Sequence, residues 1–177
     1  EANDGEPIKL QLKMKVWNTK NGVGVLATFH VNDDKTEVKG QISPADIESI
    51  QAEEFIVFDY FNKKVTTMKQ DEQQEATLNN EEYGLYLIIP KKHAITPIGL
   101  LNKYVSAATY NVLNTTDEKL VVQLREGGQF AFTAEVRPQK VTVNGQEVSI
   151  SKVDSDKSLY SVDCVDIAQY PILEVQL

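Results

Sequence analysis

Few residues in this chain have the types and spacing that chemistry requires. The two histidines, His30 and His93, lie far apart in sequence and form no His-Glu-x-x-His pattern, so each is interpreted as a structural histidine. The one cysteine, Cys164, excludes an internal disulfide, and its strand-like surroundings favour a small buried hydrophobe. The sequence therefore predicts no metal site and no cofactor.

Paired carboxylates would be the mark of glycoside hydrolysis, in which one group acts as the acid and the other as nucleophile or base. The chain has 26 acidic residues, so formal pairs such as Asp46 with Glu48 arise from abundance alone. Asp59 differs, because it stands between Phe58 and Tyr60 in an apolar run. An acid inside a strand is usually paired with a neighbouring cation, so we predict no catalytic residue in this chain.

Composition and charge narrow the classes of partner. A net charge of -8 repels phosphate backbones, and no cluster of lysine and arginine offsets it, so nucleic acid is not an expected partner. No apolar run approaches the roughly 18 residues of a membrane helix, so no membrane partner is expected either. The acidic opening Glu1–Glu6 lacks the character of a signal peptide. We expect a soluble chain, cut from a longer one, in an unassigned compartment.

The elements that must position any site are predicted to be strands. Apolar residues alternate with lysines and glutamine over Ile8–Val16, and Val23–Val31 repeats the alternation after the turn Asn18–Gly22, so the two runs should pair as a hairpin. Further strand patterns cover Phe55–Phe61, Val65–Met68, Tyr83–Ile89, Leu120–Leu124, Phe130–Val136, Val141–Val143, Glu147–Ile150, Leu159–Val162 and Ile172–Val175.

Turn chemistry completes the prediction of fold class. Ser43–Asp46 has the N-cap hydroxyl, proline and acid of one short helical turn. Asn144-Gly145 is a strong hairpin turn, and Pro97–Tyr104 is interpreted as irregular or strand. Roughly ten or more short strands with almost no helical period indicate packed antiparallel sheets. We therefore predict an all-β, two-sheet antiparallel β-sandwich with at most one short helical turn, forming a single domain over residues 1–177.

Several motifs carry a family resemblance. The strand ending in Trp17-Asn18, its turn, and the glycine-valine strand Gly22–Phe29 resemble the opening of the C-terminal domain of raffinose synthases and seed imbibition proteins. These are α-galactosidase-like glycoside hydrolases of family 36. Val31–Lys39 is much shorter than in plant members. The resemblance continues in order through Gly40–Asp46, Leu78–Pro90, Pro97–Leu100, Arg137-Pro138, Val141–Gly145 and Tyr170–Ile172.

The resemblance implies an upstream catalytic (β/α)8 barrel that holds the nucleophile and the acid. The chain would then be a non-catalytic C-terminal accessory domain that packs on this barrel, in a parent enzyme acting on α-galactosyl oligosaccharides by hydrolysis or transfer. Two alternatives stay open: a carbohydrate-binding module, and an immunoglobulin-like adhesion or scaffold domain. Carbohydrate is thus a candidate ligand, although one tryptophan is few for a platform of exposed aromatic rings.

Two strands are apolar on both faces, which predicts that something covers the second face. In Phe55–Phe61 the residues of both parities are mostly apolar, and Tyr83–Ile89 repeats this. The cover is either a loop such as Gln70–Asn80 or the barrel itself. In the second case the candidate barrel-docking surface consists of Trp17, Asn18, Phe58, Tyr60 and Tyr86.

Overall fold

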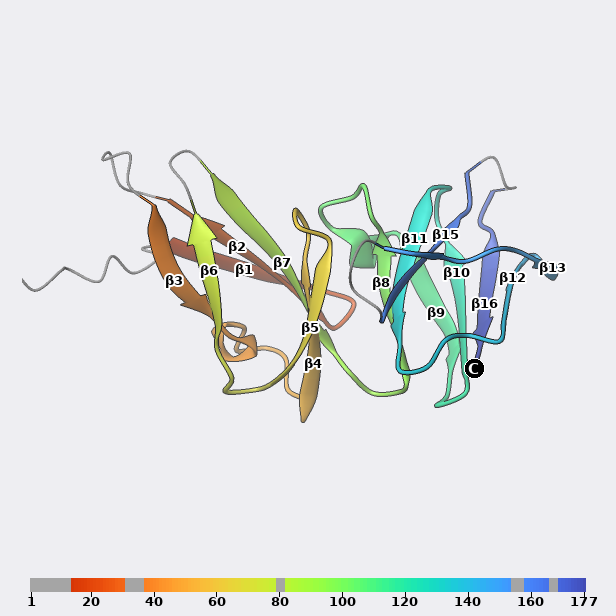
Figure 1. Ribbon diagram of the computed structural model, residues 1–177, viewed down its shortest axis with the longest axis horizontal. Helices are drawn as coiled ribbons and strands as arrows, with labels where there is room; N and C mark the ends of the chain where they lie inside the picture. The colour runs from red at the N-terminus through yellow and green to blue at the C-terminus, as the bar shows by residue number, and fades with distance from the viewer. Residues whose placement is uncertain (1–13, 31–36, 79–81, 154–157, 166–168) are drawn as a thin grey trace, which may run out of the picture.

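The computed structural model describes residues 14–30, 37–78, 82–153, 158–165 and 169–177. Within these ranges the chain forms sixteen strands and two 3-10 turns (Figure 1). Every strand pair is antiparallel. The predicted all-β antiparallel sandwich is confirmed, but the strands are divided among four sheets where two were predicted, because they form two sandwiches in succession. The predicted strand over Ile8–Leu12 lies outside the described residues.

The first half of the chain forms two sheets. The N-inner sheet has the order β1 (Met14–Lys20), β2 (Val23–Phe29), β7 (Tyr83–Pro90), β4 (Glu54–Asp59) and β5 (Lys64–Lys69). The N-outer sheet is a two-stranded ribbon of β3 (Val38–Ile42) and β6 (Gln74–Leu78). The predicted hairpin of β1 and β2 is confirmed, with Trp17 opposite Leu26. Together the two sheets make the N-terminal sandwich.

The second half forms the C-terminal sandwich. The C-inner sheet has the order β14 (Ser151–Lys152), β15 (Leu159–Asp163), β11 (Gln129–Ala134) and β8 (Ile95–Leu100). The C-outer sheet has the order β13 (Gln146–Glu147), β12 (Lys140–Val143), β16 (Ile172–Gln176), β10 (Lys119–Leu124) and β9 (Tyr110–Thr115). The Asn144-Gly145 turn joins β12 to β13 with positive φ at both residues, as a type I′ hairpin requires.

Three apolar cores hold the four sheets in a stack. One core lies between the N-outer and N-inner sheets, and another lies between the two C-terminal sheets. The third joins the sandwiches, because Phe58 and Leu87 of the N-inner sheet cluster with Ala131 and Leu159 of the C-inner sheet. Both inner sheets are therefore buried on two faces, which explains the doubled apolar pattern of β4 and β7. Figure 1 shows the two sandwiches side by side.

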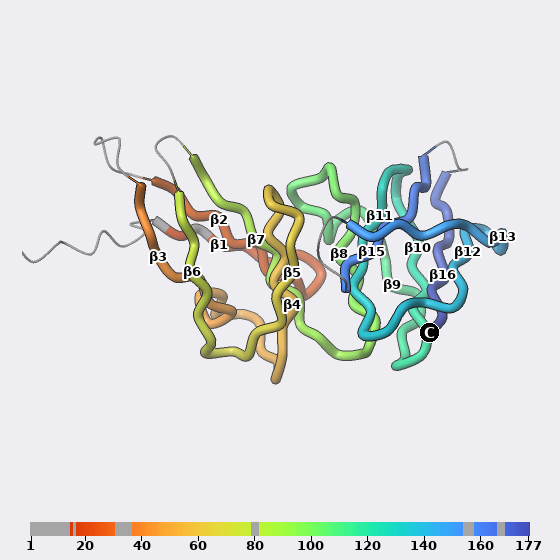
Figure 2. Tube along the Cα trace, in the orientation of Figure 1, coloured from red at the N-terminus to blue at the C-terminus, as the bar shows by residue number. Residues whose placement is uncertain are grey.

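Polar contacts fasten the sandwiches at their edges. Asn21, in the β1–β2 turn, donates from Nδ2 to the carbonyl oxygen of Ala107 at 3.0 Å. Lys91 follows β7, where the chain crosses between the sandwiches (Figure 2), and its Nζ lies 3.1 Å from Glu54 and 2.8 Å from Glu135. One lysine thus bridges a carboxylate of each sandwich.

Two short turns interrupt the strands. The predicted one, η1 (Pro44–Asp46), is confirmed: Ser43 accepts from the Ala45 amide, and the Asp46 carboxylate accepts from the Ser43 amide at 2.9 Å. A second turn, η2 (Ser106–Ala108), follows β8. Gly99 has a φ of +114°, and a Cβ there would lie 2.4 Å from the carbonyl oxygen of Ser106. Glycine is required at this approach.

Candidate functional site

The chemistry-bearing residues singled out from sequence lie apart in the fold. Nδ1 of His93 lies 3.0 Å from Asp117, and Cys164 is fully buried, as predicted. Burial raises the pKa of the Cys164 thiol to about 11, with Asp163 as a second cause, so the thiol stays protonated near neutral pH. Across the described ranges, no three His, Cys, Asp or Glu residues are grouped to hold a metal ion.

Asp59 shapes a turn. Its Oδ1 accepts from the backbone amide of Asn62 at 3.0 Å, and its Oδ2 accepts from Asn62 Nδ2 at 2.8 Å. The partner is thus an amide where the sequence suggested a cation. The carboxylate is half-buried at the end of β4 and is held rigidly over the β4–β5 turn. An acid tied in this way can position a ligand or a loop.

The five residues of the predicted docking surface divide between two faces. Trp17 is 41% exposed and Asn18 is also exposed, whereas Phe58, Tyr60 and Tyr86 are exposed by 1%, 9% and 5%. Phe58 and Tyr60 belong to the core that joins the sandwiches, and Tyr86 belongs to the N-terminal core. The chain itself therefore covers these three residues, because the C-inner and N-outer sheets lie over them. The exposed part of the predicted surface is Trp17 and Asn18.

Strand register assigns these residues to the two faces of the N-inner sheet in a way that differs from their exposure. Trp17 is opposite Leu26, Leu26 is opposite Tyr86, and Tyr86 is opposite Asp59, so these four side chains share one face of the N-inner sheet. Phe58 precedes Asp59 and so points to the other face. The C-inner sheet of the same chain covers the face that bears Phe58. Neither the loop nor the barrel that the sequence suggested is therefore needed to cover Phe58.

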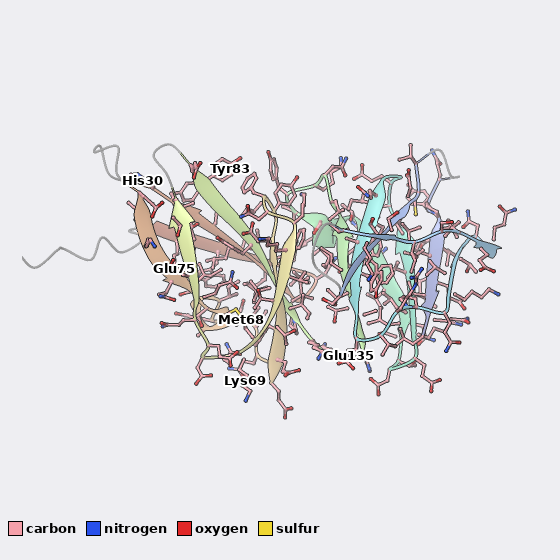
Figure 3. The ribbon with its side chains drawn as sticks, viewed as in Figure 1. His30, Met68, Lys69, Glu75, Tyr83 and Glu135 are labelled. Atoms are coloured by element: carbon pink, nitrogen blue, oxygen red, sulfur yellow. The ribbon has the colours of Figure 1, made fainter. Side chains whose placement is uncertain are left out.

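Five aromatic rings form a continuous series along one rim, which we call the aromatic edge: Phe29, Tyr83, Phe61, Tyr60 and Tyr104. Successive ring centroids lie 6.2, 5.0, 5.2 and 5.1 Å apart. Phe61 and Tyr83 meet at 88° and are each 45% exposed. Figure 3 labels Tyr83 on the rim opposite Lys69 and Glu135.

Sequence reasoning missed the aromatic edge. Its members come from the end of β2, the β4–β5 turn, the start of β7 and the segment after β8. No spacing rule joins four such segments, and only the stacked sheets bring them together. A weak indication was present, since Tyr60-Phe61 directly precedes a polar turn, a place where large apolar side chains need a partner.

A lysine and a tyrosine hydrogen bond contact the rings of the aromatic edge. The Lys63 ammonium lies 3.7 Å from the centroid of the Tyr60 ring and donates to the carbonyl oxygen of Leu101 at 2.9 Å. Burial lowers the pKa of Lys63, and Asp59 partly opposes this. The pKa of Tyr83 is raised, first by its side-chain hydrogen bond with Tyr104. This network joins the two sandwiches at the rim.

A hollow of about 410 Å³ opens beside the aromatic edge, and we call it the rim hollow. Aromatic and polar side chains share its wall: Phe61, Tyr83 and Tyr86, with Asp59, Asn62 and Thr77. Burial, and then the Asp59 charge, raise the pKa of Tyr86 to about 12, so its phenol is neutral. Thr77 and Leu78, at the end of β6, complete the wall, so the hollow opens where the N-outer sheet ends.

Two further depressions lie where the sandwiches meet. One, of about 560 Å³, has Tyr60, Lys63 and Lys152 in its wall. The other, of about 240 Å³, is mostly apolar and lies between the β1–β2 turn and the strands β8 to β10. The first has two lysines and the second has few polar groups, so of these three depressions the rim hollow is the one that combines exposed rings with a hydrogen-bonded carboxylate.

The chain is similar in sequence to a known protein family and to two curated proteins. The family model for raffinose synthase or seed imbibition protein Sip1 matches residues 9–164. A probable galactinol–sucrose galactosyltransferase 6 of Arabidopsis thaliana is 21% identical over 199 residues, covering 93% of this chain and 26% of that protein. A galactinol–sucrose galactosyltransferase of Oryza sativa subsp. japonica is 23% identical over 172 residues, covering 80% of this chain and 22% of the relative. The chain thus spans about a quarter of the length of these relatives.

Proposed function

Because the chain belongs to the raffinose synthase or seed imbibition protein family, we propose that it is the non-catalytic C-terminal part of a larger enzyme that acts on α-galactosyl sugars. The observation that carries this proposal is the family match over most of the chain, together with relatives about four times as long. Those relatives are named as enzymes of galactosyl transfer between galactinol and sucrose. Transfer of a galactosyl group or α-galactoside hydrolysis is the corresponding reaction of the whole protein.

The chemistry of the described residues supports a non-catalytic role. A glycosidase acid needs an apolar setting that raises its pKa. Asp59 is committed through both oxygens to Asn62, and Glu82, the other acid of the rim hollow, is exposed. The chain would contribute packing, and the reacting groups would come from a (β/α)8 barrel elsewhere in the polypeptide.

Trp17 and Asn18 are the proposed seat of that barrel. Trp17 stands exposed on β1, an edge strand of the N-inner sheet. An edge strand offers unpaired backbone groups, and a large exposed ring beside it gains free energy when a neighbour covers it. This surface would fasten the N-terminal sandwich to the catalytic domain.

The test compares the 177-residue chain with the complete encoded protein, using an aryl α-galactoside and a galactinol–sucrose mixture as substrates. We expect turnover by the complete protein and none above the buffer rate by the chain alone. An Asp59→Asn variant is the control for the chain. Turnover by the chain that disappears in this variant would contradict a non-catalytic role, and absence of both reactions in the complete protein would contradict the proposed reaction class.

A further inference from the structure

The rim hollow presents a corner of two exposed rings. Phe61 and Tyr83 meet edge to face at 5.0 Å and remain 45% exposed, although apolar rings gain free energy when covered. Their positions are fixed from behind, since Tyr83 packs on Phe29 and Phe61 packs on Tyr60. A rigid corner of this kind favours ligands with a flat, C–H-bearing face, because ring faces carry partial negative charge.

The polar groups of the hollow are arranged in advance. Asp59 uses one lone pair on each oxygen for Asn62, which leaves further acceptor sites on the carboxylate. The same two bonds hold the Asn62 amide, whose second N–H and carbonyl oxygen have no other partner among the described residues. The Thr77 hydroxyl is in the same wall. Binding at such groups costs little side-chain entropy.

Charge selects among ligands with an apolar face. Among the described residues of its wall, the acids are Asp59 and Glu82, and none is a lysine or an arginine. The nearby Lys63 ammonium is directed at the Tyr60 ring and the Leu101 carbonyl. An anionic ligand such as a sugar phosphate or a nucleotide would be repelled. A neutral molecule with several hydroxyl donors would satisfy the carboxylate and the amide together.

We propose that the rim hollow is a carbohydrate-binding site, in which a pyranose ring of a neutral oligosaccharide stacks in the corner of Phe61 and Tyr83 and its hydroxyls hydrogen-bond to Asp59 and Asn62. The volume of about 410 Å³ lies in the range of small-molecule sites. The site differs from the proposed barrel seat at Trp17 and does not depend on the activity of the complete protein.

The experiment is an NMR titration of the chain with methyl α-galactopyranoside, methyl α-glucopyranoside and cellobiose, and with glucose 6-phosphate and choline as anionic and cationic probes. Saturable shifts are expected at residues of the rim hollow with at least one neutral sugar, and none with the phosphate. Phe61→Ala should weaken sugar binding about tenfold or more. Tyr170→Ala, which removes an exposed ring from the C-terminal sandwich, should leave it unchanged.

A second variant distinguishes loss of sugar binding from loss of the fold. Asp59→Asn keeps an oxygen for the Asn62 amide, so the turn should persist while sugar affinity falls several-fold. The proposal is overturned if no neutral sugar gives saturable shifts, if both ring variants bind equally, or if choline alone binds. It is also overturned if the complete protein loses the sugar binding of the isolated chain, because the hollow would then be a docking seat.

Discussion

The two sandwiches differ in how completely their sheets cover one another. In the C-terminal sandwich, sheets of four and five strands enclose sixteen buried apolar residues among those that the structure describes. In the N-terminal sandwich, a two-stranded ribbon packs on a five-stranded sheet, and twelve of the described apolar residues are buried between them. The end of β6 in the smaller N-outer sheet, at Thr77 and Leu78, forms part of the wall of the rim hollow. The sandwich with the larger difference between its facing sheets is thus the one that carries this hollow.

Phe58→Ala should have the largest effect, because it opens the core that couples the sandwiches. Phe58 is 1% exposed, and the loss should be about 3–5 kcal/mol of unfolding free energy. Urea unfolding followed by Trp17 fluorescence reports the N-terminal sandwich, and far-ultraviolet circular dichroism reports all strands. The two transitions should coincide in the wild type and separate in the variant. Coincident transitions in the variant would show that the edge contacts alone couple the halves.

A matched pair of leucines tests how completely the sheets of each sandwich enclose its core. Leu173 in the C-terminal core and Leu26 in the N-terminal core are both fully buried. Either Leu→Ala change should cost about 2–5 kcal/mol, with Leu173→Ala nearer the upper end because its enclosed site can collapse less. Chemical denaturation of both variants measures this. A larger loss for Leu26→Ala would reverse the comparison.

Tyr86 links the rim hollow to alkaline stability. Its pKa is raised to about 12 in the folded chain, so the unfolded chain releases the phenol proton first as pH rises above 10. The contribution of the Tyr86 phenol to the free energy of unfolding is therefore fully present below pH 10. It falls above pH 10, by about 1 kcal/mol near pH 11. Tyr86→Phe should remove this part of the alkaline loss in denaturant melts. An unchanged pH profile would show that the phenol titrates normally.

Lys91→Met should have the smallest effect on the free energy of unfolding. Hydrogen bonds first to Glu135 and then to Glu54 raise the pKa of Lys91, while burial opposes them. The contribution of the charged Lys91 to the free energy of unfolding is therefore present below pH 10.5, the ordinary lysine value. It is lost as pH rises through the higher pKa of the folded chain. Both carboxylates are largely exposed, so the loss should be at most about 1 kcal/mol near neutral pH. A loss several times larger would mean that this bridge, more than the shared core, couples the sandwiches.

The fold class followed from local patterns. Alternation in β2, the capping box at Ser43 and the Asn144-Gly145 turn are all set within a few residues, so sequence was sufficient for them. Four of the described strands were not predicted: β3, β6, β9 and β14. β9 is exposed on both faces after Tyr110, and so it has no apolar alternation to detect. Of the predicted strand Glu147–Ile150, only Glu147 is in a strand, at the end of β13, because residues 148–150 connect β13 to β14.

The candidate site was less accessible to sequence reasoning. The doubled apolar faces of β4 and β7 did predict a cover for Phe58, but its source required the topology. The rim hollow depends on where a two-stranded ribbon ends over a wider sheet, which is a long-range property. Trp17 shares a sheet face with the buried Leu26, so its exposure comes from the position of β1 at the edge of the N-inner sheet, which strand parity does not indicate.

The division of the stack along the chain has a consequence for biosynthesis. All strands of the N-terminal sandwich lie within residues 14–90, and those of the C-terminal sandwich follow from residue 95. The ribosome therefore completes the first sandwich while the second is absent. At roughly 5–20 residues per second, the face bearing Phe58 and Leu87 stays uncovered for several seconds or longer. During that interval the nascent chain presents an apolar sheet face that the second sandwich later covers.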